Sequence, residues 1–368
     1  MRKEEIVQNL RSRIIAGEFS SQGALPLRHF LLEHYDASNM TVQRAINQLT
    51  GEGFLFSRGS KGVVLSPTPP NRFRFAVVTA PSEAREEIFN DSLWGALQQS
   101  LEEYHRLHPE YSFETYTIRV SGPYQPEYLR LQNDLRCGLL AGVIIPRSLD
   151  AALLNGLRGY PVVVHDRRAD ATYGFRYFYD WSSMTAMAIE QLKRRGASRI
   201  AVIMLATSSR RVADSVERAV FSSSGTISHP EWIQGVFFRD AETPWGAHLV
   251  RLLFRNRGDC PDGLVVLNEN LLGQVVGQLD AMSLVPGRDV HLVSHCNVPA
   301  TGRHMRNVDY VSFNASKLLE RSIRTLEQLR DDSQLPDNIP ITPELIPGKQ
   351  GGKKCLNRNA SKRATPSP

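Results

Sequence analysis

Apolar residues recur with helical spacing through the first fifty residues and with strand spacing directly after them. Ile6 and Leu10 belong to an apolar stripe with steps of three and four, which predicts a helix over residues 3–16. Similar stripes predict a second helix over residues 27–35 and a third over residues 39–50. The segment FLFSRGSKGVVLS then predicts two short strands around a glycine-rich tip. We therefore expect three helices and a β-hairpin at the start of the chain.

The pattern changes after a short proline-rich segment, SPTPPNR, which is typical of a stiff linker. Beyond it, apolar strands such as FRFAVVTAP and GLVVLN alternate with amphipathic helices such as MTAMAIEQLKRRG. This alternation predicts parallel sheets covered on both faces by helices, and the length favours two α/β lobes over one. The expected division is a first domain over residues 1–66, a linker over 67–72, a two-lobed domain over 73–348 and a basic disordered tail over 349–368.

Charge and cysteine content narrow the class of protein. The net charge is +6, but the last twenty residues alone hold six Lys or Arg and no acid, so the basic pI does not by itself indicate nucleic-acid binding. The four cysteines form no CxxC pair, which favours neither a zinc site nor a disulfide framework. The charged first residues lack a signal-peptide pattern and no run of eighteen apolar residues occurs, so we expect a cytoplasmic protein without a membrane partner.

The third predicted helix, within SNMTVQRAINQL, carries amides and hydroxyls on its exposed face where Lys and Glu would be usual. Such directional donors and acceptors suit base edges and phosphates. Together with the second helix, this helix predicts a helix-turn-helix, and the hairpin predicts a wing. The predicted DNA contacts are Arg28, His29, Ser38, Asn39, Thr41, Gln43 and Arg44 in the helices, with Arg58, Ser60 and Lys61 in the wing. The alternative is that these side chains are solvated surface groups.

Residues 3–65 resemble the DNA-binding domain of the GntR family. The resemblance depends on four motifs: Leu25-Pro26, the helix start Ser-x-Met-Thr-Val, the helix end Leu-x-x-x-Gly, and a glycine-framed wing. The wing is one residue longer than the family's Gly-x-Gly. The family commonly has arginine where this chain has His29, Asn39 and Gln43. Because arginine pairs best with guanine and the amides with adenine, we expect an operator that depends less on guanine at those positions.

Residues 73–348 resemble the ligand-binding domain of the LacI/GalR family, which has the periplasmic-binding-protein fold. The carrying segments include YPVVVHDRR, FYDWSSMTAMAIEQLKRRGASRIAVI and CPDGLVVLNEN, and ITPELIPG lies where the family has its terminal strand. The resemblance implies a homodimer that binds double-stranded operator DNA and senses a small-molecule effector between its lobes. A sugar is the leading candidate effector and a purine or other metabolite the alternative; a solute-binding protein without a regulatory role is the remaining class.

Effector contacts are expected at the carboxyl ends of the strands, where ligands of this fold lie. Strand-end polar residues also cap helices or pair with one another, so each candidate has a structural alternative. The chain departs from the family in SRRVADSVERAV, which lacks the usual glycine and aromatic residue, and in His295-Cys296-Asn297, which lacks the usual aspartate. The candidates are Phe89, Trp94, Arg147, Asp166, Arg167, Asp180, Trp181, Arg210, Arg211, Asn268, Glu269, His295 and Asn297.

Catalytic motifs are not evident in the sequence. It contains no HExxH, P-loop or GxSxG pattern, and its ten histidines form no set with metal-ligand spacing. We therefore expect neither an enzyme nor a bound cofactor or metal.

Overall fold

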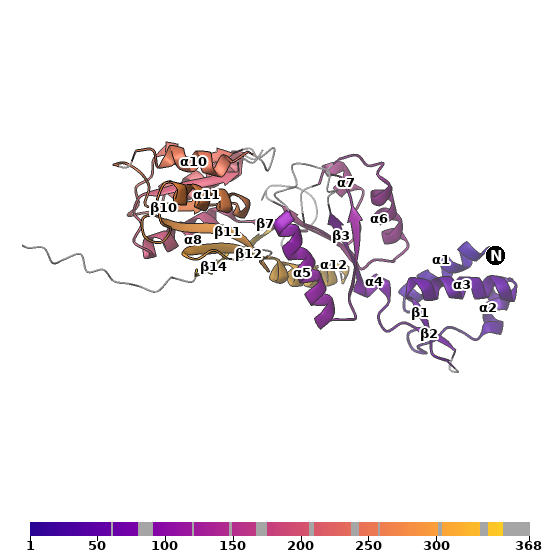
Figure 1. Ribbon diagram of the computed structural model, residues 1–368. Helices are drawn as coiled ribbons and strands as arrows, with labels where there is room; N and C mark the ends of the chain where they lie inside the picture. The colour runs from indigo at the N-terminus through magenta and orange to yellow at the C-terminus, as the bar shows by residue number, and fades with distance from the viewer. Residues whose placement is uncertain are drawn as a thin grey trace, which may run out of the picture.

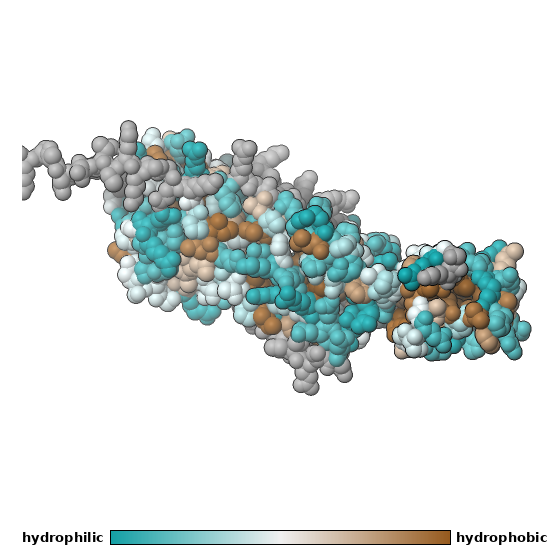
Figure 2. Space-filling model, turned by 90° about the horizontal axis from the view of Figure 1, so that it is seen from below, coloured by the Kyte–Doolittle hydropathy of each residue, from teal (hydrophilic) through white to brown (hydrophobic). Residues whose placement is uncertain are grey.

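The computed structural model describes three bodies in a row, a small N-terminal head followed by two α/β lobes (Figure 1). In the space-filling view the head is a separate unit at one end of the larger body (Figure 2). None of the described helices is long and apolar enough to cross a membrane. The described residues are 1–59, 62–79, 91–119, 121–146, 149–166, 175–205, 210–236, 243–256, 258–300, 304–331 and 338–348.

The head contains three helices and an antiparallel hairpin. The elements are α1 (Lys3–Ile15), α2 (Arg28–Tyr35), α3 (Asn39–Glu52), β1 (Leu55–Ser57) and β2 (Val63–Leu65). Its core is built from the apolar stripes of the three helices, and Leu10, Val42 and Leu49 are fully buried in it. Ser38 starts α3 as its N-cap and Gly53 ends it with a φ of 96°, a value that glycine adopts without strain.

The first lobe follows a one-turn helix, α4 (Pro70–Phe73), which overlaps the end of the predicted linker. Its sheet is wholly parallel, with the order β13-β7-β6-β5-β3-β4. Helices α5 and α12 pack on one face and α6 and α7 on the other, as the buried clusters on the two faces show. The elements are β3 (Arg74–Thr79), α5 (Asp91–Leu107), β4 (Ser112–Thr117), α6 (Pro126–Arg136), β5 (Gly142–Ile145), α7 (Ala151–Asn155), β6 (Val162–Asp166), β7 (Phe175–Tyr179), α12 (Ala315–Arg330) and β13 (Asn338–Ile341).

The second lobe repeats this layered plan with the strand order β14-β12-β11-β10-β8-β9, in which only β14 is antiparallel to its neighbour. Helices α8 and α9 cover one face, and α10 and α11 cover the other. The elements are α8 (Trp181–Arg194), β8 (Ile200–Leu205), α9 (Arg210–Phe221), a 3₁₀ turn η3 (Pro230–Trp232), β9 (Ile233–Val236), α10 (Trp245–Leu253), β10 (Gly263–Val266), α11 (Glu269–Ala281), β11 (His291–Val298), β12 (Val308–Asn314) and β14 (Glu344–Ile346).

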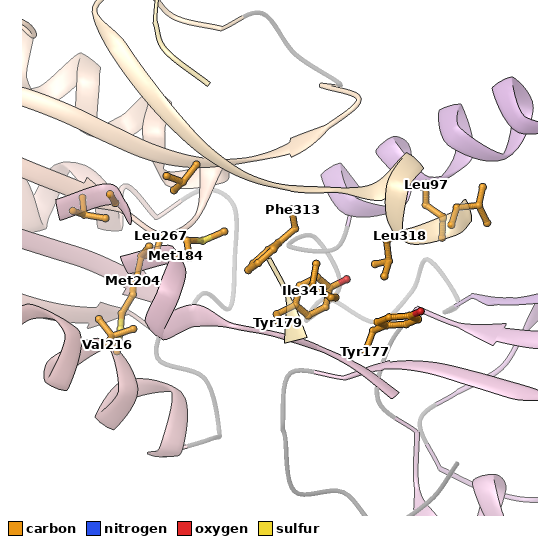
Figure 3. Close-up of a cluster of buried hydrophobic side chains, with 14 of the residues drawn as sticks. Leu97, Tyr177, Tyr179, Met184, Met204, Val216, Leu267, Phe313, Leu318 and Ile341 are labelled. Carbon is orange, nitrogen blue, oxygen red and sulfur yellow. The ribbon is translucent and has the colours of Figure 1, made fainter. Parts of the chain in front are cut away.

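The chain passes between the lobes three times, from β7 to α8, from β12 to α12 and from β13 to β14. One buried apolar cluster continues through these crossings from lobe to lobe. Figure 3 shows Tyr179, Phe313 and Ile341 in its middle, with Met184 toward the second lobe and Leu318 toward the first. The two lobes are therefore joined by packed side chains as well as by the backbone.

The predicted fold class is confirmed, with a helix-turn-helix head and two mainly parallel sheets. One detail differs, because the segment ITPELIPG does not form one terminal strand: it begins with the last residue of β13, in the first sheet, and then forms β14, in the second. Thr342 and Pro343 lie between the two strands. The predicted basic tail over 349–368 lies outside the described residues.

Candidate DNA-binding and effector sites

The amino-terminal turn of α3 is preorganised by two hydroxyls. Ser38 Oγ accepts from the backbone N–H of Thr41 at 3.3 Å, and the two hydroxyl oxygens lie 2.9 Å apart. The remaining N–H groups of this first turn have no helical partner, and they carry the positive end of the helix dipole. The start of α3 therefore offers both backbone and hydroxyl donors to a phosphate.

Arg28, at the start of α2, reaches across to the exposed face of α3. Its Nη1 donates to Asn39 Oδ1 at 2.7 Å, and its Nη2 donates to Gln43 Oε1. Gln43 Nε2 in turn donates to Asn47 Oδ1 at 2.7 Å. Arg28, Asn39, Gln43 and Asn47 thus form one continuous set of hydrogen bonds, which we call the amide network. Asn47 was not among the predicted DNA contacts, although its position four residues after Gln43 places it on the same helix face.

The other predicted DNA contacts lie around this network. His29 and Arg44 are exposed, and the His29 ring lies 4.1 Å from that of Phe30. Arg58 is exposed at the end of the hairpin, where its N–H donates to the Gly62 carbonyl at 2.8 Å. Ser60 and Lys61, the other two predicted wing contacts, lie outside the described residues.

The carboxyl-terminal end of α3 is fixed to the rest of the head by a buried ion pair. Arg11 donates to both carboxylate oxygens of Glu52, with Nη2 at 2.7 Å from Oε1 and Nε at 3.1 Å from Oε2. Gln48 Nε2 donates to the same carboxylate at 2.8 Å. Only 6% of Arg11 is exposed, so this pair is desolvated and its bidentate geometry holds α1 against α3.

The head also contacts the first lobe directly. Arg74, the first residue of β3, donates through Nη2 to the carbonyl of Glu52 at 3.2 Å. Leu139, in the loop after α6, packs against the apolar core of the head. Gly138 beside it approaches Ile15 so closely that a Cβ there would collide with the isoleucine side chain. The ends of α1 and α3 therefore contact the first lobe, so the head is packed against this lobe as well as joined to it by the chain.

Two of the predicted effector contacts pair with each other at the carboxyl ends of β10 and β11. Asn297 Nδ2 donates to Glu269 Oε1 at 2.6 Å, and the Asn297 N–H donates to Oε2 at 3.4 Å. Burial raises the pKa of the neighbouring Cys296 thiol to about 12, and the charge of Glu269 adds to the effect. That thiol is therefore protonated at neutral pH.

Two further candidates meet beside the crossing strands. The ring centroids of Trp181 and His295 lie 5.9 Å apart, and Phe313 lies 5.7 Å from Trp181 in an edge-on arrangement. The indole Nε1 of Trp181 is buried and has no hydrogen-bond partner among the described residues. Phe313 was not predicted to lie here, because its strand reads in sequence as an ordinary apolar core strand.

The structure gives other candidates structural roles or leaves them undescribed. Asp180 accepts from the Ser183 N–H at 3.0 Å and Asn268 from the Asn270 N–H at 2.9 Å, so both cap helices. Trp94 packs against the shared apolar cluster, and the exposed Arg210 lies 3.9 Å from Asp214. Lying outside the described residues are Phe89, Arg147 and Arg167, together with the side chains of Asp166 and Arg211.

A cavity of about 480 Å³ lies in the first lobe, away from these side chains. Its lining includes Val162 and Phe175, which begin β6 and β7, and Arg330, which ends α12. Ligands of open parallel sheets lie at the opposite, carboxyl ends of the strands. We therefore place the candidate effector site at the strand ends and not in this cavity.

Two separate parts of the chain match known protein families. Residues 2–65 match the family described as bacterial regulatory proteins, gntR family, and residues 189–349 match the periplasmic binding protein-like domain. No curated protein matches the chain in sequence.

Several solved structures share the fold. A regulatory protein of the LacI family from Chloroflexus aggregans has 16% sequence identity and a TM-score of 0.60, covering 76% of this chain and 99% of that one. A sugar-binding LacI-family transcriptional regulator from Escherichia coli, in complex with phosphate, has 15% identity and a TM-score of 0.54, covering 74% and 96%. The dimeric Lac repressor with an 11-residue C-terminal deletion has 13% identity and a TM-score of 0.56, covering 76% and 100%. The chain is therefore a transcription regulator that joins a gntR-family helix-turn-helix domain to a periplasmic-binding-protein-like domain.

Proposed function

We propose that this protein is a homodimeric regulator that binds an operator through residues 1–66 and senses a sugar with residues 73–348. The observation that carries the proposal is the hydrogen bond from Arg74 to the last carbonyl of α3. This bond attaches α3, the proposed recognition helix, to β3. That strand belongs to a parallel sheet, and ligands of this fold lie at the carboxyl ends of such strands. A ligand that favours one arrangement of the lobes can then bias the position of the head.

The side chains at the strand ends support a hydroxyl-rich ligand. Glu269 supplies carboxylate acceptors, and Asn297 supplies both a donor and an acceptor. The indole of Trp181 supplies an apolar plane for the carbon face of a sugar ring and a buried N–H for one hydroxyl. The same plane, together with Phe313, also suits stacking with a purine, which is the second candidate.

Homodimer formation follows from the same proposal. A helix-turn-helix head reads one half-site, and two heads reading a palindrome gain affinity and specificity. The Lac repressor in the comparison is described as dimeric. Sedimentation of the full chain should give twice the monomer mass, and a monomer on a selected operator would contradict this part of the proposal.

The effector is identified by thermal shift of the full chain against a panel of sugars and purines. A true ligand raises the melting temperature with concentration by mass action. The isosteric Glu269→Gln variant should lose most of the shift, whereas Glu190→Gln, which alters an exposed surface pair on α8, should retain it. If a purine stabilises the protein and no sugar does, the sugar assignment is wrong. If the ligand acts equally on wild type and Glu269→Gln, the site assignment is wrong.

A further inference from the structure

The amide network on α3 has a definite direction. A guanidinium group donates hydrogen bonds and cannot accept them, so the amide oxygens of Asn39 and Gln43 must face Arg28. The Gln43 amide nitrogen then donates to Asn47 Oδ1, which turns the Asn47 amide nitrogen away from the network. One cation therefore sets the orientation of three amides that would otherwise be free to flip.

The orientation decides what the helix presents to DNA. The amide oxygens of Asn39 and Asn47 accept hydrogen bonds within the network, so the NH₂ groups of these two residues are left to face DNA. Both residues are exposed. Arg44, also exposed, adds a guanidinium group. Each of the three amide oxygens already accepts one hydrogen bond within the network, and the positive charge of Arg28 disfavours a further donor at the oxygens of Asn39 and Gln43. The exposed groups of the amide network are therefore mainly donors.

The bases differ in how well their major-groove donors and acceptors match such a face. Adenine is read by an amide that accepts from N6 and donates to N7, whereas guanine presents two acceptors, N7 and O6, and thymine presents O4. A face of donors matches guanine and thymine and leaves the adenine amino group without an acceptor. This reverses the expectation from the sequence, in which the amides at positions 39 and 43 favoured adenine.

We propose that Arg28 is a specificity-determining positioning residue that orients the α3 amides so that they present mainly donors, and that the operator therefore carries acceptor edges, above all guanine, opposite Asn39 and Asn47. Arg28 acts through the amides, and this role is separate from any contact of its own with a phosphate. The inference rests on the proposed DNA binding and deepens it by naming the base class that is read.

The test is selection of binding sites from random DNA with the full-length wild type and with Arg28→Met, which keeps the apolar stem and removes the donors. Wild type should select guanine or thymine at the positions under α3. Arg28→Met should accept adenine there, with the guanine-over-adenine preference reduced at least roughly fivefold. Arg58→Met serves as the control, because Arg58 lies in the hairpin, outside the network; it should weaken binding without admitting adenine at the positions under α3. Thermal unfolding of each variant checks that the head remains folded.

A second readout separates positioning from a simple phosphate contact. If Arg28 acts through Gln43, Arg28→Met should change base preference much less in a Gln43→Ala background than in wild type. A uniform loss of affinity for all sequences, with the salt dependence reduced by about one charge per half-site and the consensus unchanged, would overturn the proposal. So would a wild-type consensus with adenine at these positions. If wild type selects no sequence at all, the proposed function fails, and this inference fails with it.

Discussion

Breaking the buried ion pair of the head should strongly destabilise the head and leave the sensor intact. Arg11→Met removes the bidentate donor and leaves the Glu52 carboxylate, whose side chain is 16% exposed, without its countercharge. Loss of one partner of a buried pair typically costs about 3–5 kcal/mol. A head of this size has a total stability on the order of 3–9 kcal/mol, so the substitution should remove at least about a third of the stability of the head.

The matched control removes both charges. In Arg11→Met/Glu52→Leu no carboxylate is left unpaired, and replacing a buried ion pair with apolar residues is often neutral or stabilising. The hydrogen bond from Arg74 goes to the backbone of residue 52 and is compatible with this change. The double variant should therefore recover most of the lost stability.

Scanning calorimetry of the full chain measures both outcomes, because separate domains give separate transitions. The transition of the head should fall by more than about 12 °C in Arg11→Met and by much less in the double variant, while the sensor transition stays in place. Equal losses in the two variants would show that the cost comes from lost packing and not from an unpaired charge. A loss below about 1 kcal/mol in Arg11→Met would show that water reaches the Glu52 carboxylate.

Two further predictions concern the first lobe. Burial lowers the pKa of His165 to about 3, and the ring hydrogen-bonds Ser322 at 2.8 Å, so the folded lobe binds fewer protons than the unfolded chain between that pH and about 6.5. The free energy of unfolding of the lobe should fall as the pH decreases below 6.5, by up to about 1.4 kcal/mol per pH unit from this group. When this free energy is measured by urea unfolding at several pH values, His165→Gln should depend less steeply on pH than wild type. An unchanged pH dependence would exclude His165 as the cause. Gly138→Ala and Gly225→Ala both place alanine at positive φ, 65° and 74°, and should each cost about 1–2 kcal/mol, but only the first collides with Ile15. Only Gly138→Ala should therefore raise amide hydrogen exchange at the end of α1, and equal exchange in both variants would refute the contact between head and lobe.

The sequence predicted the parts of this protein that depend on local interactions. The start of α3 at Ser38 and its end at Gly53 follow from capping chemistry that acts within a few residues. The alternation of strands and helices predicted the layered sheets for the same reason, since each element shows its own periodicity. The cap roles of Asp180 and Asn268 were foreseen as an alternative to effector binding.

The contacts that give the molecule its specificity were not predictable in the same way. Arg28 is 11 residues from Asn39 and 15 from Gln43, and only the angle between α2 and α3 brings them together. The packing of Leu139 on the head joins residues that are far apart in sequence. At the effector site the pairing of Glu269 with Asn297 depends on the parallel register of β10 and β11, which no local pattern specifies.

The central claim is that effector binding and operator binding are coupled through the contacts between head and sensor. Fluorescence anisotropy of a selected operator, titrated with the full chain with and without the stabilising ligand, measures this coupling directly. The operator Kd should change by roughly 5- to 150-fold with the ligand, and the ligand Kd should change by the same factor with the operator. An operator Kd that is the same with the sensor empty and saturated would contradict the account.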